Sequence, residues 1–217
     1  MGSPEDRCRL VLIVPQGEDA GLQAKALEDA LRGGDVASVI IPQYALDDDR
    51  FQKRAEVLVP IVQAAGAAAL VAGDSRVAGR VKADGLHVVG GLEPLAEAVE
   101  KFTPKLIVGG GNADDRHKAL EQGEANPDYI FFGKLEGDIK PEPHPKNVAL
   151  GEWWASMIEI PAIVMGGSDV ASVVAVAESG VEFVALRHAV FGHAGGAAQA
   201  VAEANALLDE KAPRFGG

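Results

Sequence analysis

The sequence predicts an α/β fold in which eight parallel strands close into a barrel. Eight short apolar runs alternate along the chain with segments of helical spacing, and such alternation requires a parallel sheet with helices outside it. Continuous apolar runs are typical of strands that are covered on both faces. The chain has 217 residues and is 47% hydrophobic, which is enough for one core of this size. Eight units favour a single (β/α)8 TIM barrel over an open doubly wound sheet, although the strand count alone does not exclude the open sheet.

The order of elements follows from these runs. The expected strands cover residues 9–14, 36–41, 67–72, 85–89, 106–109, 129–132, 161–165 and 183–186. The expected helices cover residues 20–31, 49–65, 75–81, 92–102, 114–122, 148–158, a segment capped by Ser168 or Asp169 that closes at Gly180, and 194–211. Pro60 falls inside one helix and is predicted to kink or split it. We expect one domain over residues 1–217, with loose termini at 1–8 and 213–217.

Composition excludes several classes of protein. A net charge of −12 argues against nucleic acid as a partner, because the phosphate backbone would be repelled. Cys8 is the single cysteine, so the chain has neither a disulfide framework nor a cysteine metal cluster. No secretory signal and no apolar run of membrane-spanning length occur in the sequence. We therefore expect a cytoplasmic protein with no membrane partner; a homo-oligomer stays open.

Two turns near the end of the chain, the first of them glycine-rich, predict a phosphate site. Gly166 and Gly167 follow one strand, and Arg187-His188 follow the next. In a barrel of this kind, the turns after strands seven and eight hold phosphate with backbone N–H groups. Gly167 has no Cβ to obstruct an anion, and Arg187 and His188 can add positive charge. The alternative is that the two bulky side chains fill the pocket, or that Arg187 pairs with a neighbouring acid.

A proline-rich segment over residues 133–147 is predicted to be a long loop. Loops of this length in a compact domain are usually functional or disordered. Its Lys134 and Lys140 are candidate catalytic cations that would neutralise phosphate charge. A solvated loop is an equally good account of these basic side chains.

Four further polar residues stand at the expected carboxyl ends of strands, where barrel enzymes place their active sites. Gln43, His87 and Asn112 are candidate substrate-binding residues. His87 lies in an apolar run, so a satisfied core histidine is the more ordinary interpretation. Asp74 is a candidate Mg²⁺ ligand, because that ion prefers one or two carboxylates together with phosphate oxygens. A helix N-cap is the more frequent role for an aspartate at this position.

Several segments, in order, resemble the thiamine-phosphate synthase and TenI family of barrels. The similar pieces span most of the chain: GDSRVA at 73–78, ADGLHV at 83–88, PDYIFFG at 127–133 and IPAIVMGG at 160–167. They look like the family's NDRVDLA, ADGVHL, ADYIGFG and IPVVAIGG segments. Each piece is short, but the ordered set is specific for the fold and the family.

The resemblance implies a transferase of thiamine biosynthesis. Such an enzyme joins hydroxymethylpyrimidine diphosphate to thiazole phosphate, releasing diphosphate and forming thiamine phosphate. The family uses Mg²⁺ and basic side chains on the diphosphate, and the protein supplies position and charge rather than a nucleophile. Carried over, Asp74 would bind Mg²⁺, Lys140 would contact diphosphate, and Gly166, Gly167 and His188 would hold the thiazole phosphate.

The sequence departs from the family pattern at several of these positions. The family's arginine and lysine after the second strand fall on Pro42 and Tyr44, and Glu93 is the one available substitute for a second metal carboxylate. A glycine, Gly110 or Gly111, stands where the family has a serine. Asn112-Ala113-Asp114 occupies the region in which TenI proteins have a histidine. The alternative function is therefore a non-catalytic or TenI-like barrel that binds a phosphorylated ligand.

Overall fold

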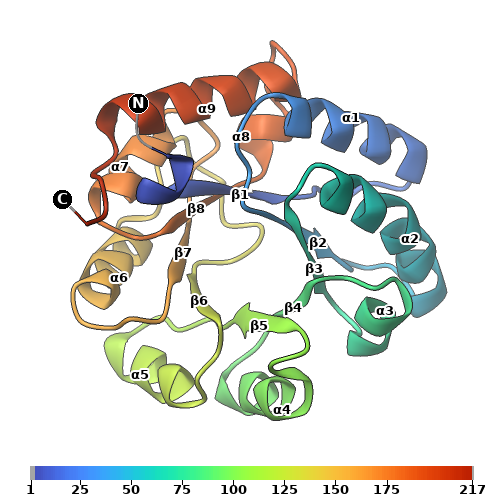
Figure 1. Cartoon of the computed structure of the whole chain (residues 1–217), viewed down its shortest axis with the longest axis horizontal. Coiled ribbons are helices and arrows are strands. Elements are labelled where there is room, and N and C mark those ends of the chain that lie inside the picture. Colours follow the sequence, from blue (N-terminus) through green and yellow to red (C-terminus); the bar gives the residue numbers. More distant parts are fainter. Residues whose placement is uncertain (1–2, 217) are drawn as a thin grey trace.

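The computed structural model describes residues 3–216, and its eight strands form a closed parallel barrel in sequence order (Figure 1). The strands are β1 (Arg9–Ile13), β2 (Ser38–Pro42), β3 (Ala68–Ala72), β4 (Gly85–Val88), β5 (Ile107–Gly110), β6 (Tyr129–Phe132), β7 (Ala162–Met165) and β8 (Phe183–Leu186). The ring closes where β1 pairs with β8, with Arg9 opposite Phe183 and Leu12 opposite Leu186. The predicted (β/α)8 barrel is confirmed.

Helices surround this barrel on all sides (Figure 1). They are α1 (Ala20–Arg32), α2 (Asp48–Ala64), α3 (Ser75–Arg80), α4 (Leu92–Phe102), α5 (Arg116–Glu124), α6 (Pro145–Ala155), α7 (Ser172–Glu178), α8 (His188–Phe191) and α9 (Ala197–Lys211). A short 3-10 turn, Pro4–Asp6, precedes β1. Because each helix returns the chain to the start of the next strand, all strand carboxyl ends lie at one end of the barrel.

The core has two layers, because successive strand residues point to opposite faces of the sheet. One layer fills the barrel itself and includes Val11, Ile13, Ile40 and Leu70. The larger layer lies between the sheet and the helices, and Leu10, Leu12 and Val39 belong to it. The residues of both layers are almost fully buried, which explains the continuous apolar runs in the sequence.

The structure departs most clearly from the sequence-based expectation at Pro60 and at the starts of three helices. Pro60 lies on the exposed side of α2 and does not split the helix. Helix α6 begins at Pro145, three residues early, since proline suits a first helical position and the His144 side chain accepts from Lys146 N–H at 3.2 Å. Helix α7 begins at Ser172, beyond a turn over residues 168–171, and α9 begins at Ala197.

We expected loose ends, but the described parts of both termini pair with each other. Arg7 and Arg214 form an antiparallel bridge, and Phe215 N–H donates to the Asp6 carbonyl at 2.7 Å. The Arg7 side chain is 1% exposed and bonds to Asp209 of α9 at 2.8 Å. Residues 1, 2 and 217 lie outside the described part of the chain.

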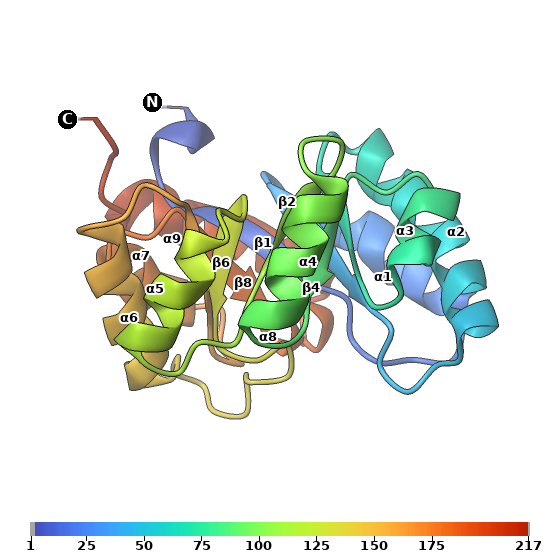
Figure 2. The same ribbon diagram turned by 90° about the horizontal axis from the view of Figure 1, so that it is seen from below.

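Seen from the side, the chain ends lie at one end of the barrel and the loop after β6 lies at the other (Figure 2). The amino end of the barrel is therefore occupied by the paired termini. The carboxyl ends of the strands, with the loops that follow them, form the opposite face. Among residues 3–216, no helix combines the length and apolar character that crossing a membrane requires.

Candidate active site

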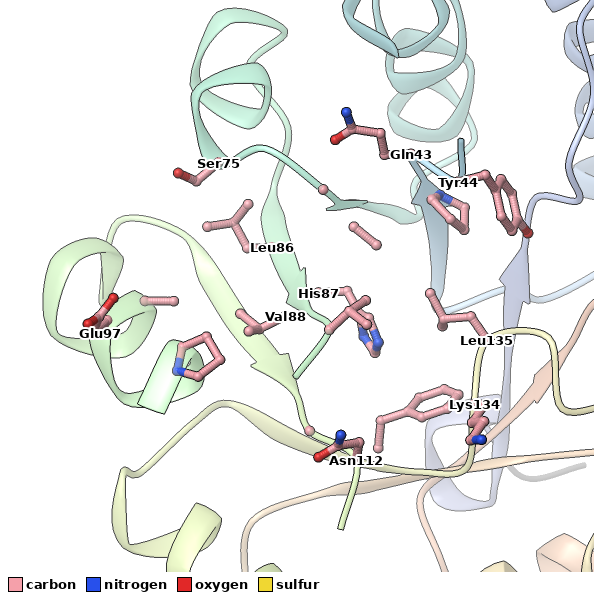
Figure 3. Close-up of a pocket in the computed structure, with 18 of the residues that line it drawn as sticks. Gln43, Tyr44, Ser75, Leu86, His87, Val88, Glu97, Asn112, Lys134 and Leu135 are labelled. Carbon is pink, nitrogen blue, oxygen red and sulfur yellow. The ribbon is translucent and has the colours of Figure 1, made fainter. Parts of the chain in front are cut away.

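A pocket of about 840 Å³ opens at the carboxyl ends of β2 to β6 (Figure 3). Four of the predicted site residues line it: Gln43, His87, Asn112 and Lys134. Apolar walls from Phe131 and Leu135 lie among them. The pocket also extends over β4 towards α4, where Glu97 and Lys101 reach its rim. This combination of apolar walls and a few polar groups is typical of a small-molecule site.

His87 is a buried residue of the barrel interior whose ring points into the pocket (Figure 3). Its Nδ1 lies 2.8 Å from the Tyr129 hydroxyl, and the two rings are stacked with centroids 5.9 Å apart. Burial lowers the pKa of His87 to about 3 and raises the pKa of Tyr129, so both groups are neutral at physiological pH.

The tautomer of His87 follows from the Tyr129 hydroxyl. In the described part of the chain this hydroxyl has one hydrogen-bond partner, His87 Nδ1. A buried hydroxyl hydrogen needs an acceptor, so Tyr129 donates to Nδ1 and the ring proton resides on Nε2. His87 therefore offers an uncharged N–H donor at the floor of the pocket.

Gln43 and Tyr44 join the loop after β2 to neighbouring elements. Gln43 Oε1 accepts from Asp74 N–H at 3.0 Å, and its Nε2 donates to the Leu46 carbonyl at 3.1 Å. The Tyr44 hydroxyl donates to the Val14 carbonyl at 2.7 Å. Tyr44 adopts a φ of 50°, which is rare for a non-glycine residue and often marks a functional loop.

Asp74 is the N-cap of α3, and its carboxylate is already paired. It accepts from Arg76 N–H at 2.8 Å, and Arg76 Nε donates to Oδ2 at 2.9 Å. These side-chain and backbone bonds from Arg76 lower the pKa of Asp74 to about 2. Glu93, the second predicted metal ligand, is exposed on the first turn of α4 and does not line the pocket.

These contacts do not fit a magnesium site formed by the protein alone. No group of three or more metal-ligating side chains occurs within residues 3–216. Magnesium would have to displace the Arg76 guanidinium to reach both Asp74 oxygens. The Asp74 carboxylate, which does not line the pocket, is instead balanced by an arginine that also contacts Asp48 at 3.3 Å.

The turns after β7 and β8 are occupied by the loop after β6. Ser168 N–H donates to the Lys140 carbonyl at 2.8 Å, and Gly167 N–H donates to Ser172 Oγ at 3.0 Å. Gly167 is needed here because a Cβ would overlap the Pro141 carbonyl. The predicted phosphate-binding N–H groups therefore have partners within the chain.

Arg187 is paired with an acid, which is one of the alternatives that the sequence left open for this residue. Its Nη2 donates to Asp138 Oδ1 at 2.6 Å, and His188 N–H donates to Asp138 Oδ2 at 2.8 Å. The Asp138 side chain is completely buried, whereas the His188 and Lys140 side chains are exposed. Lys140 does not line the pocket, so of the two predicted catalytic lysines only Lys134 does.

Three residues that contribute to this face were not singled out from the sequence as site residues. In the sequence, Tyr129 has the pattern of an ordinary strand residue. Tyr44 is notable there only because it departs from the family pattern. Asp138 looks like an ordinary charged residue of a polar loop when the sequence alone is considered. Its position after Gly137, in a loop with few apolar residues, carries no sequence signal that it would be buried.

The comparisons with known proteins agree with this architecture. The family model described as thiamine monophosphate synthase matches residues 10–190. A thiamine-phosphate synthase of Rhodospirillum centenum is 35% identical over 93% of this chain and 98% of its own, and one of Hyphomonas neptunium is 30% identical over 96% and 97%. The structure of thiamine phosphate pyrophosphorylase from Pyrococcus furiosus covers 95% of this chain and 98% of its own at 21% identity, with a TM-score of 0.76, and so supports the fold. The chain belongs to the thiamine monophosphate synthase family.

Proposed function

We propose that the protein is a transferase of thiamine biosynthesis that joins hydroxymethylpyrimidine diphosphate to thiazole phosphate. The observation that carries this proposal is the match to a thiamine-phosphate synthase along nearly its whole length. The pocket agrees with it, because about 840 Å³ with apolar walls and neutral hydrogen-bonding groups suits planar heterocycles.

In this reaction the bond between the pyrimidine methylene carbon and the diphosphate oxygen breaks, and its electron pair leaves with diphosphate. The lone pair of the thiazole nitrogen then forms the new carbon–nitrogen bond. The chain binds and orients the two rings, so most of its contribution is proximity and charge. No protein nucleophile is needed.

The described residues have distinct roles in this proposal. His87 Nε2–H at the floor donates a hydrogen bond to a ring nitrogen of the bound heterocycle, and Phe131 packs against the ring. The Asn112 amide lines the same pocket, and Lys134 supplies a cation at its rim for the leaving diphosphate. Magnesium, where the family's chemistry uses it, would have to come with the diphosphate, because Asp74 is already paired with Arg76.

A second candidate function is a barrel of this family that binds such a ligand without transferring it. This second function is favoured by the two positions after β2 at which the family has an arginine and a lysine, because this chain has Pro42 and Tyr44 there. Neither side chain carries a positive charge, and the Tyr44 hydroxyl donates to the Val14 carbonyl, so neither residue can replace those cations.

One assay separates the two candidates. The protein is incubated with both substrates, with and without Mg²⁺, and thiamine phosphate is measured after chromatography. We expect product from the wild type and a loss of at least tenfold in Lys134→Met, with Lys105→Met, an exposed lysine outside the pocket, as a matched control. If no product forms while each substrate still binds in a titration, the transferase assignment is wrong and the binding function remains.

A further inference from the structure

A second cavity, of about 630 Å³, lies beside the pocket described above. Its walls come from the loop between β1 and α1, the loop between β2 and α2, and one face of α2. Helices α1 and α2 lie side by side on this flank of the barrel (Figure 1). Tyr44 is the residue that lines both cavities. A volume of this size is within the range of small-molecule sites.

The face of α2 that lines this second cavity carries three positive charges. Arg50, Lys53 and Arg54 are spaced so that they share one side of the helix. Among the described residues that line the cavity, Glu18 carries the one negative charge. Asp47, which lies 3.6 Å from Arg50, is not part of the lining. In a chain with a net charge of −12, this local excess of cations indicates a place that attracts anions.

Arg54 is the buried member of this group. It is 3% exposed, and its Nε and Nη1 have no hydrogen-bond partner within residues 3–216. Its Nη2 donates to the Pro15 carbonyl at 2.9 Å, and no carboxylate of the described chain pairs with the guanidinium. Buried charges are usually paired, because an unpaired charge is costly to keep out of water. An anion in the adjoining cavity would supply the missing counter-charge.

The lining favours a small molecule that carries a phosphate group. Arg50 and Lys53 are exposed, so they are free to bond a ligand directly, and guanidinium and ammonium groups both suit phosphate oxygens. Arg54 is enclosed and acts through its charge, which low-dielectric surroundings strengthen. Three cations suit a doubly charged phosphate better than a single carboxylate. Leu46 and Val57 add an apolar wall for the organic part of the ligand.

We propose that the cavity between the loops after β1 and β2 binds a small molecule through its phosphate group, with Arg54 in the inner wall and Arg50 and Lys53 at the rim. The bound phosphate compensates the buried charge of Arg54. This site is separate from the pocket of the proposed transfer reaction and from the turns after β7 and β8. It is therefore an additional ligand site, and the transfer reaction does not require that it be filled.

The test titrates inorganic phosphate into ¹⁵N-labelled protein at constant ionic strength and follows the amide signals of Gly17 and Leu46, which line the cavity. We expect saturable shifts of both signals in the wild type. Binding should be about tenfold weaker in Arg54→Met, because a charge beside the ligand is removed from surroundings of low dielectric. Lys53→Met should also weaken binding. Since Lys53 is exposed, this second variant keeps the test decisive if Arg54→Met does not fold.

Arg32→Met is the matched control, because Arg32 is an exposed arginine of α1 outside the cavity and its replacement changes the net charge equally. Its phosphate affinity, measured at Gly17 and Leu46, should equal that of the wild type. The amide signals of Gly167 and His188 report separately on phosphate at the turns after β7 and β8. Shifts confined to those two residues contradict the proposal, as does equal affinity at Gly17 and Leu46 in the wild type and both α2 variants. The titration uses no synthase substrate, so its outcome is independent of the transferase assay.

Discussion

At the scale of single residues, the floor of the pocket is defined by a neutral histidine. His87 is held between the Tyr129 hydroxyl at 2.8 Å and the ring of Phe131, whose centroid is 5.1 Å away. Burial lowers its pKa to about 3 from an ordinary value near 6.5. The unfolded chain therefore binds a proton at His87 between these two pH values, and the folded chain does not.

This difference predicts how stability depends on pH. Where the unfolded state binds the extra proton, the free energy of unfolding falls as pH falls, by about 1.4 kcal/mol per pH unit for one group. We expect this loss in the wild type from pH 6.5 to pH 5, relative to His87→Asn, which does not titrate. Urea unfolding of both proteins at several pH values measures it. Parallel curves for the two proteins would show that His87 is protonated in the folded state.

Arg54 is a second buried residue with an unusual environment. It is 3% exposed, and in the described structure its Nε and Nη1 have no hydrogen-bond partner. Its Nη2 donates to the Pro15 carbonyl at 2.9 Å, and the guanidinium lies 5.7 Å from the Tyr44 ring centroid. Burial lowers the pKa of Arg54, which indicates that its charge is destabilised.

Replacing Arg54 by methionine should therefore preserve or increase stability. The long apolar side chain fills most of the same space and removes a buried charge that has no acidic partner in the described structure, and such a charge is costly to keep out of water. Arg7→Met is the control, because Arg7 is equally buried but bonded to Asp209 and Asn205, and it should destabilise. Thermal unfolding measures both. A large loss of stability in Arg54→Met would mean that Arg54 has a partner the structure does not show.

At the scale of elements, the loop after β6 is the part of the carboxyl face that differs most from expectation. The sequence correctly predicted β6 and a polar loop with prolines. It did not predict that this loop packs against the turns after β7 and β8, because burial of Asp138 depends on Arg187, 49 residues away. Gly167 was correctly identified as a point of close approach, but the group that approaches it is the Pro141 carbonyl of the chain itself.

Gly167→Ala tests this packing. The added methyl group must push the loop away from β7, and such overpacking typically costs about 1–3 kcal/mol. Gly79→Ala in α3 is the matched control, since a Cβ there meets nothing within 4 Å and alanine favours helix. We expect destabilisation for Gly167→Ala and an unchanged or higher free energy of unfolding for Gly79→Ala. Equal changes in the free energy of unfolding at both positions would mean that the loop moves away from Gly167 at little energetic cost.

At the scale of the whole molecule, the barrel was predictable because its signal is repeated. Eight apolar runs in alternation with eight helical segments constrain the topology, even where Pro60 or the start of α6 misleads locally. The site was less predictable, because its groups come from one strand and several separate loops. Gln43, His87, Asn112 and Lys134 do meet in one pocket, whereas Glu93 and Lys140 lie outside it, and nothing local in the sequence separates these two groups.

The transferase reaction itself is the most direct test of this account. We would follow a mixture of protein, Mg²⁺, hydroxymethylpyrimidine diphosphate and thiazole phosphate by ³¹P NMR. The account predicts that the organic diphosphate signals disappear while inorganic diphosphate and thiamine phosphate appear in equal amounts. A mixture in which the organic diphosphate persists, or releases diphosphate without forming thiamine phosphate, would contradict it.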